Sequence, residues 1–314
     1  MSDNDSQPID AERTDSTLGA FHAGFACFVG RPNAGKSTLT NAIMGQKIAI
    51  TSNRPQTTRH IVRAILHRPE SQLILVDTPG LHRPRTLLGE RLNDLVRSTW
   101  SEVDVIGLCL PANEKPGPGD KFIANEIASL KAKVVAVVTK IDLVGKDALM
   151  RHLTNVNELA DFADVVPVSA KTGENLDELV KVLGSHLPES PQLYPDGMIT
   201  EDPERVMMAE LIREAALEGV RDELPHSLAV VIEDVEDEMS DGGPRKKIWA
   251  EIYVERPSQK GIIIGKGGAR LKRVGTKARK GIAQLIDGRV YLDLHVRVAK
   301  DWQRDPKMLE RLGF

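Results

Sequence analysis

A glycine-rich segment of eight residues, Gly30-Arg31-Pro32-Asn33-Ala34-Gly35-Lys36-Ser37, constrains the fold of this chain more than any other feature. It matches the pattern G-x-x-x-x-G-K-[ST] without a gap, follows an apolar run at 25–29 and opens a helical stretch at 36–44. Such a loop wraps backbone N–H groups around phosphate oxygens at a helix N-terminus. We therefore predict a phosphate site formed by Gly30, Asn33, Ala34, Gly35, Lys36, Ser37 and Thr38.

Apolar runs and helical stretches alternate from residue 21 onwards. The runs cover 25–29, 61–67, 73–77, 103–110, 134–139 and 165–168, and the helical stretches cover 36–44, 89–100, 121–130, 146–159 and 176–186. Strands that are apolar almost throughout are typical of a parallel sheet covered on both faces. The alternation predicts a doubly wound, mainly parallel α/β domain over 21–190.

The rest of the chain has a different order. Three prolines between 188 and 195 favour a linker over 191–203, followed by a second domain over 204–314. A helix at 203–223, strands at 227–235 and 247–255, two helices around a glycine turn and a strand at 289–298 predict a small α+β unit of order α-β-β-α-α-β. Residues 1–20 carry five acidic residues, one arginine and no apolar period, so we expect a disordered acidic tail.

Composition and charge exclude several classes of protein. Two cysteines in 314 residues exclude a disulfide framework and a four-thiolate zinc site. The apolar runs are too short to span a bilayer and the N-terminus is acidic, so we expect a cytoplasmic protein.

The net charge of −3 hides two blocks of opposite charge. Residues 201–241 carry fourteen acidic residues and three arginines, and residues 245–280 carry twelve basic residues and two glutamates. Blocks of this kind indicate charged partners.

Two motifs downstream predict a magnesium site and a nucleotide-dependent switch. Asp77-Thr78-Pro79-Gly80 follows a buried strand, where Asp77 can support Mg²⁺ and Gly80 can donate its N–H to a γ-phosphate. We expect Ser37, Thr58 and Asp77 at the metal, although the sequence leaves open whether Thr57 or Thr58 is the ligand. The predicted switch residues are Gln56, Thr57, Thr58, Arg59, Thr78, Pro79 and Leu81.

Two further motifs at strand ends predict the choice of base. In Thr139-Lys140-Ile141-Asp142, the carboxylate can accept from guanine N1–H and the 2-amino group, a pattern that adenine lacks. The stem of Lys140 can cover the base face. Ser169-Ala170-Lys171 can supply a backbone N–H to guanine O6. The motifs in this order, each at a strand end, predict GTP; a P-loop kinase is disfavoured because no acceptor site or lid segment is evident.

A glycine turn in the second domain predicts RNA binding. Gly265-Lys266-Gly267-Gly268 fits G-x-x-G between two helices, the turn through which KH domains let a single-stranded backbone of four nucleotides approach. The basic block surrounds it, whereas a basic run elsewhere is more often a solvated face. The expected RNA-binding residues are Lys260, Gly261, Ile263, Ile264, Gly265, Lys266, Gly267, Gly268, Arg270, Lys272 and Arg273.

On these motifs the chain resembles the Era family of bacterial ribosome-assembly GTPases over 21–314. The resemblance implies one GTPase domain and one type II KH domain, GTP, GDP and Mg²⁺ as ligands, and a role as a GTP-hydrolysing switch. It also implies binding to the 3′ end of 16S ribosomal RNA, not DNA, on the small (30S) subunit during its maturation. Peripheral association with the inner membrane is a further implication, although the sequence offers no amphipathic anchor.

Three positions bear on activity. The family usually has Asn where this chain has Thr139; that amide contacts guanine N7 and braces the phosphate loop, so we expect weaker nucleotide binding here. Leu81 stands where other GTPases place a water-orienting glutamine, which predicts slow intrinsic hydrolysis. Asn33 either binds K⁺ beside the phosphates, as in relatives, or tolerates an unusual loop backbone.

The alternative function is that of a non-catalytic RNA-binding protein, which uses GTP only as a ligand that orders its structure.

Overall fold

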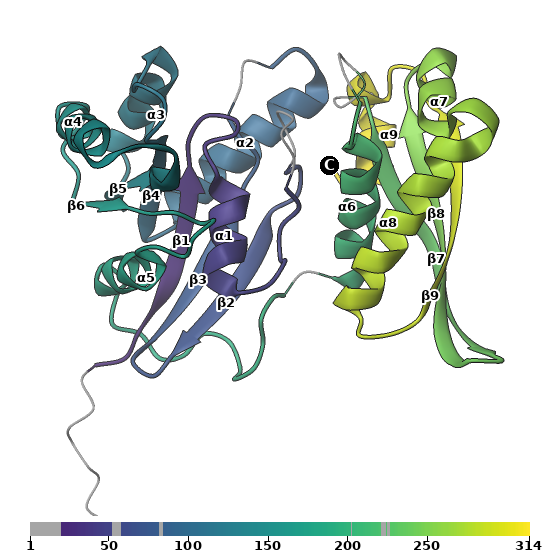
Figure 1. Ribbon diagram of the computed structural model, residues 1–314, viewed down its shortest axis with the longest axis horizontal. Coiled ribbons are helices and arrows are strands. Elements are labelled where there is room, and N and C mark those ends of the chain that lie inside the picture. The colour runs from purple at the N-terminus through teal and green to yellow at the C-terminus, as the bar shows by residue number, and fades with distance from the viewer. Residues whose placement is uncertain (1–19, 52–57, 82–83, 202, 221–223, 225–226) are drawn as a thin grey trace, which may run out of the picture.

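The computed structural model describes residues 20–51, 58–81, 84–201, 203–220, 224 and 227–314, which form two domains lying side by side (Figure 1). The strands of the first domain are β1 (His22–Val29), β2 (Val62–Arg68), β3 (Ser71–Asp77), β4 (Val105–Pro111), β5 (Lys133–Thr139) and β6 (Asp164–Pro167). Its helices are α1 (Lys36–Met44), α2 (Leu87–Glu102), α3 (Pro118–Ala128), η1 (Ile141–Leu143), α4 (Lys146–Asn157) and α5 (Leu176–Ser185).

The first domain is the doubly wound α/β fold expected from the alternating runs. Its sheet has the order β2-β3-β1-β4-β5-β6, in which only the β2–β3 pair is antiparallel. Helices α1 and α5 cover one face through Leu39 and Leu183. Helices α2, α3 and α4 cover the other face through side chains such as Val96 and Ile127. Both faces are therefore buried, which explains why the strands are apolar almost throughout.

The second domain has the predicted order of elements, with corrected bounds. Its elements are α6 (Glu204–Leu217), β7 (Ala229–Ser240), β8 (Gly243–Val254), α7 (Pro257–Ile264), η2 (Lys266–Gly268), α8 (Ala269–Leu285) and β9 (Val290–Val298), followed by η3 (Trp302–Arg304) and α9 (Pro306–Arg311). β7 pairs antiparallel and β9 parallel with the central β8. The first helix is shorter than predicted because Gly219 adopts a left-handed conformation after Leu217, and helix α9 was not predicted.

The strands predicted at 227–235 and 247–255 extend further toward each other than expected and form one long β-hairpin. Strands β7 and β8 run on to Ser240 and from Gly243, so the acidic run of β7 lies opposite the basic run of β8. Glu238 pairs with Arg245 at 2.6 Å, and Asp237 pairs with Lys246 at 3.4 Å. Part of the two charge blocks is therefore neutralised within the domain.

A shared apolar cluster joins the two domains. Leu88 and Leu92 of α2 pack with Trp302 and Leu309, and His60 stacks on Phe314 with ring centroids 4.9 Å apart. The two domains thus form a packed contact in addition to their covalent linker.

Candidate functional site

The glycine-rich loop connects β1 to α1 in a conformation that only a few residue types adopt. Gly30, Asn33 and Gly35 have φ values of 148°, 62° and 99°. A Cβ on Gly30 would lie 2.8 Å from the carbonyl oxygen of Cys109, so no larger residue fits there. Asn33 is among the residues that tolerate a left-handed backbone best, which accounts for its place in the loop whether or not it also binds a cation.

Lys36 lies at the centre of this loop. Its ammonium donates to the carbonyl oxygens of Gly30 at 3.0 Å and Arg31 at 3.1 Å. Burial lowers the pKa of Lys36, although the nearby carboxyl of Asp77 opposes that effect. Gly80 is a neighbour of the same ammonium, because a Cβ added to Gly80 would lie 3.8 Å from Lys36 Nζ. The loop therefore holds a positive charge where phosphate oxygens are expected, with Ala34 buried behind it and Thr38 exposed on α1.

Three oxygen-bearing side chains from separate parts of the sequence meet beside the loop. Ser37 Oγ donates to Asp77 Oδ2 at 2.8 Å, Thr58 Oγ1 donates to the same oxygen at 3.1 Å, and the two hydroxyls lie 3.2 Å apart. Burial raises the pKa of Asp77, and the hydrogen bond from Ser37 opposes the rise. Asp77 Oδ1 is buried and has no hydrogen-bond partner among the described residues. Hydroxyl and carboxylate oxygens suit Mg²⁺, so this cluster fits the ion that the sequence implies.

The predicted switch residues fall into different environments. Gln56 and Thr57 lie outside the described residues, whereas Thr58 is the threonine that reaches Asp77. Thr78 and Pro79 are buried at the end of β3, and Leu81 packs on the core shared with α2 and α3. No side chain with a water-orienting function stands at residue 81, as the sequence indicated.

Arg59 occupies a place that the sequence did not reveal. Its side chain leaves the first domain, is 1% exposed and donates from Nη1 to the carbonyl oxygen of Leu228 at 2.7 Å. The guanidinium lies 5.8 Å from the ring centroid of Trp302. Burial, with a further contribution from Arg213, lowers the pKa of Arg59 to about 9. The residue that directly follows Thr58 is thus embedded in the second domain.

The predicted base-binding residues gather at the carboxyl ends of β5 and β6. Ser169 Oγ donates to Asp142 Oδ1 at 2.7 Å and accepts from the N–H of Thr172 at 3.1 Å, so the carboxylate is held in place. Lys140 has a φ of 59°, and both Asp142 and Lys171 are exposed. Ala170, which lies between Ser169 and Lys171 in the sequence, is half-buried against the core of the first domain.

Thr139 does part of the work expected of the family's asparagine. Its buried hydroxyl donates to the carbonyl oxygen of Ala34 at 2.7 Å and so connects β5 to the phosphate loop. A hydroxyl has one proton to donate, and this bond uses it. The loop is therefore braced, but no donor of Thr139 is left for a base.

The G-x-x-G turn between α7 and α8 is open to solvent. Gly267 and Gly268 have φ values of 57° and 78°, and a Cβ on either would meet no atom of the described residues within 4 Å. Gly265 differs, because a Cβ there would lie 2.7 Å from Cβ of Arg270. Lys266, Lys272 and Arg273 are exposed around the turn, with Lys260 and Gly261 on α7 beside it. This arrangement suits the close approach of a polynucleotide backbone.

Two residues predicted to bind RNA need correction. Ile263 is fully buried in the core of the second domain; its neighbour Ile262 is 51% exposed, and Ile264 is half-buried. Arg270 donates from Nη2 to the carbonyl oxygens of Ala216 at 3.2 Å and Glu218 at 2.8 Å, so its guanidinium is engaged within the domain. Burial lowers the pKa of Arg270. Ile263 and Arg270 therefore support the fold of the turn instead of facing a ligand.

Two further kinds of feature, a cluster of acidic, histidine or cysteine metal ligands and a membrane-spanning helix, are absent from the part of the chain that the structure describes. Among the described residues, no three His, Cys, Asp or Glu side chains are gathered as they would be around a metal ion. Within the same ranges, no helix has the length and apolar character needed to cross a membrane.

Comparisons with known proteins agree with this geometry. A family profile described as 50S ribosome-binding GTPase matches residues 25–140, and a KH-domain profile matches residues 223–303. The chain is 64% identical to GTPase Era of Streptomyces coelicolor, over 93% of this chain and 95% of that protein. It is 63% identical to GTPase Era of Mycolicibacterium smegmatis, over 94% and 99% of the two chains.

Two solved structures superpose on nearly the whole chain. One is Era in complex with MgGDPNP and nucleotides 1506–1542 of 16S ribosomal RNA, with a TM-score of 0.89, 38% identity and coverage of 93% of this chain and 99% of that one. The other is a single-residue variant of Aquifex aeolicus Era bound to GDP·AlF₄⁻, with a TM-score of 0.89, 37% identity and the same coverage. With a complete phosphate loop, a KH turn and this similarity over both domains, the chain belongs to the Era family of GTPases.

Proposed function

We propose that this GTPase binds the 3′ end of 16S ribosomal RNA through its KH domain and assists maturation of the small ribosomal subunit. The observation that carries the proposal is the similarity, over both domains, to a relative whose structure contains MgGDPNP and nucleotides 1506–1542 of 16S RNA. The open turn at Gly267 and Gly268 and the exposed cations beside it support the same assignment.

Different residues of the nucleotide site neutralise the phosphate charge, bind the metal ion and recognise the base. Lys36 is placed to leave the loop carbonyls for the outer phosphates of GTP, because its charge gains more from phosphate than from a peptide oxygen. Ser37, Thr58 and Asp77 would hold Mg²⁺, which when bound neutralises charge on the phosphates. Asp142, fixed by Ser169, reads the guanine edge.

Potassium binding at Asn33 belongs to this proposal as a separate part. Asn33 lies in the exposed portion of the phosphate loop, where a cation would replace some of the charge that an arginine finger supplies in other GTPases. Exchange of sodium for potassium at constant ionic strength should therefore raise the rate of hydrolysis, and Asn33→Ala should flatten that response. Equal rates of GTP hydrolysis in the two salts would mean that Asn33 binds no potassium and serves only the conformation of the loop.

A binding titration tests the RNA part. Fluorescence anisotropy should show tighter binding to an RNA with the sequence of the 16S 3′ end than to a scrambled RNA of equal length and composition. Sedimentation with purified subunits should place the protein on the 30S particle and not on the 50S particle. Equal affinity for both RNAs would overturn the assignment.

We expect the protein in the cytoplasm, where ribosomes assemble. A vesicle-flotation assay would test its peripheral association with the membrane.

A further inference from the structure

Arg59 belongs to the GTPase domain, but its side chain is buried in the KH domain. The guanidinium donates to the carbonyl oxygen of Leu228 and lies over the ring of Trp302, and the residue is 1% exposed. The indole N–H of Trp302 in turn donates to the carbonyl oxygen of Ser227 at 3.0 Å, and Ser227 directly precedes Leu228. The two groups that hold the guanidinium are therefore also joined to each other.

Two carboxylates of the KH domain suit the positive charge of Arg59. Burial lowers the pKa of Arg59 and Arg213 adds to the fall, whereas the carboxylates of Glu210 and Glu255 oppose it. Glu210 is held in place by Arg213, whose Nε and Nη2 donate to its two oxygens at 2.8 and 2.6 Å. A buried charge that is hydrogen-bonded and compensated in this way favours one position, because moving it would separate it from these partners.

The anchored arginine restricts the position of its neighbour in the sequence, Thr58. Consecutive Cα atoms are about 3.8 Å apart across a trans peptide, so an anchor at Arg59 acts on Thr58 directly. The hydroxyl of Thr58 also contacts Ser37 and Asp77. These hydroxyl contacts join the expected ligands of the metal ion to one another and would rearrange when Mg²⁺ binds. The anchor at Arg59 lies outside the metal site and would persist.

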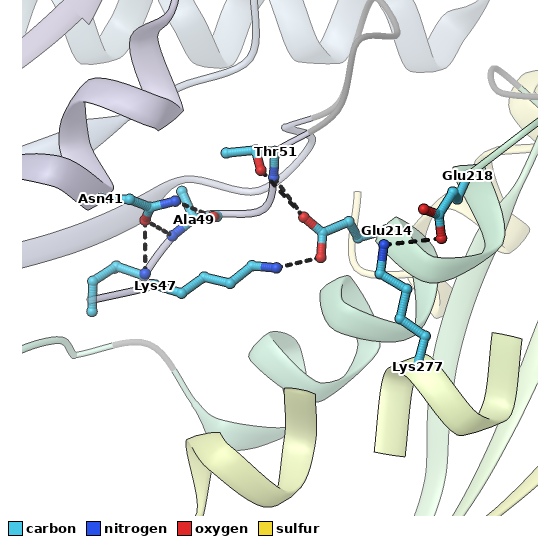
Figure 2. A network of polar contacts seen from close by, with 8 residues as sticks. Asn41, Lys47, Ala49, Thr51, Glu214, Glu218 and Lys277 are labelled. Atoms are coloured by element: carbon cyan, nitrogen blue, oxygen red, sulfur yellow. Dashed lines mark hydrogen bonds and ion pairs between the residues drawn. The ribbon is translucent and has the colours of Figure 1, made fainter. Parts of the chain in front are cut away.

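A second contact between the domains is separate from the oxygen cluster around Asp77 (Figure 2). Glu214 of α6 accepts from the backbone N–H of Thr51 at 3.0 Å and from its hydroxyl at 3.4 Å, and it pairs with the ammonium of Lys47. None of these three residues adjoins a member of the oxygen cluster in the sequence. The contact therefore joins the domains without directly holding an expected metal ligand, which makes it a useful control.

We infer that Arg59 is a positioning residue for the magnesium site, through which the KH domain holds Thr58 where the ion needs a ligand. The inference rests on the proposed function, in which Thr58 contributes to that site. A ligand that is already in place loses little conformational freedom when the ion binds, so a preorganised site binds the ion more tightly. Removing the anchor should therefore weaken Mg²⁺ binding in the GTP state and leave the phosphate loop and the base site unchanged.

Arg59→Met tests this role, because it removes the guanidinium and keeps an unbranched side chain. The readout is the affinity for a fluorescent GDPNP during a titration with Mg²⁺. We expect the free Mg²⁺ concentration at the midpoint of that titration to rise about tenfold, near the lower end of what one hydrogen bond from a charged group contributes. The affinity for GDP in EDTA should stay at the wild-type value. Arg59→Lys keeps a donor toward Leu228 and should recover most of the Mg²⁺ affinity.

Trp302→Phe makes the same test from the KH side of the junction. A phenyl ring gives a weaker cation–π contact than an indole, so we expect the Mg²⁺ midpoint to rise about twofold. In the Arg59→Met background the same replacement should add nothing further, because the guanidinium that faces the ring is gone. The double variant thus shows whether the two residues act together.

Two controls remove contacts between the domains that do not adjoin an expected metal ligand. Arg91→Met is matched in chemistry, because Arg91 of α2 donates to the main-chain oxygen of Phe314 at 2.6 Å. Glu214→Ala removes the contact drawn in Figure 2. Both variants should keep the wild-type Mg²⁺ midpoint, even where their thermal midpoints fall.

A wild-type Mg²⁺ midpoint in folded Arg59→Met, or an equal shift in the two controls, would overturn the inference. Should Arg59→Met not fold, a wild-type midpoint in Trp302→Phe would overturn it as well. Thr58→Ala, measured alongside, separates the inference from the proposed function. If Thr58→Ala shifts the midpoint and Arg59→Met does not, only the role of Arg59 is wrong. If Thr58→Ala has the wild-type midpoint, the proposed magnesium site itself is wrong.

Discussion

The phosphate loop and the KH turn are both glycine-rich loops that open a helix, yet their glycines serve opposite purposes. In the phosphate loop, Gly30 is required because Cys109 packs directly against it, and Lys36 and Thr139 bond to the loop from within. In the KH turn, a Cβ on Gly267 or Gly268 would meet nothing among the described residues. A loop that encloses a small anion is held in shape by side chains and backbone packed against its glycines. A turn that receives a polymer needs open space beside its glycines, so that the polymer backbone can approach.

The largest effect should come from removing the charge inside the phosphate loop. Lys36→Ala should weaken GTP binding by about 3 kcal/mol, roughly a hundredfold, because one residue supplies charge-assisted hydrogen bonds that no described neighbour replaces. Isothermal titration with GTP measures the loss. RNA affinity should be unchanged, and unchanged GTP affinity in the folded variant would refute the assignment of the loop.

The corresponding change in the open turn should affect only the other ligand. Gly267→Asp puts a negative charge where RNA phosphates would pass and should lower RNA affinity roughly tenfold or more, because like charges placed side by side at an interface repel strongly. Gly267→Asn is the matched control, because Asn tolerates the left-handed backbone at this position and carries no charge. The difference between the two variants isolates the charge; wild-type RNA binding by the aspartate variant would remove the KH assignment.

The brace on the phosphate loop predicts a smaller change. Thr139→Val keeps the shape of the side chain but leaves the carbonyl of Ala34 without its donor, which should weaken GDP and GTP binding by about 1 kcal/mol, roughly fivefold. Thr139→Asn should bind nucleotide more tightly than wild type, since an amide has two N–H donors where the hydroxyl has one. Dissociation rates of a fluorescent GDP would show both effects, and identical rates in all three proteins would contradict the bracing role.

The smallest effects should distinguish the cations around the turn. Lys272→Gln should lower the salt dependence of RNA binding by about 0.7 in the log–log slope, the value for one fewer neutralised phosphate on a single strand. Arg270→Gln should leave the slope unchanged and lower the thermal midpoint instead, because its guanidinium holds the carboxyl end of α6. A reduced slope for Arg270→Gln would show that the guanidinium reaches RNA after all.

The sequence predicted best the features that depend on strand ends. Parallel strands bring their carboxyl ends to one edge of a sheet, so the order of the motifs predicted that Ser37, Asp77 and Asp142 lie along the same edge. The element order of the second domain followed from the same kind of local pattern. Helix α9 was missed because its six residues are too few to display a helical period.

Contacts between distant residues could not be predicted in this way. From the sequence, Arg59 would be expected in an exposed loop. In the fold it contacts Leu228 and Trp302, which lie more than 160 residues further along the chain. Ile263 and Ile262 are identical in type, and only the pitch of α7 decides which of them is buried. The acidic and basic blocks indicated charged partners, whereas the β7–β8 hairpin pairs some members of the two blocks with one another.

Crosslinking to small ribosomal subunits tests the central claim most directly. Irradiation of the protein with 30S particles and a non-hydrolysable GTP analogue should join a peptide within residues 260–273 to the 3′ end of 16S RNA. Crosslinks that map to the GTPase domain, to another region of the RNA, or to 50S particles alone would contradict the account.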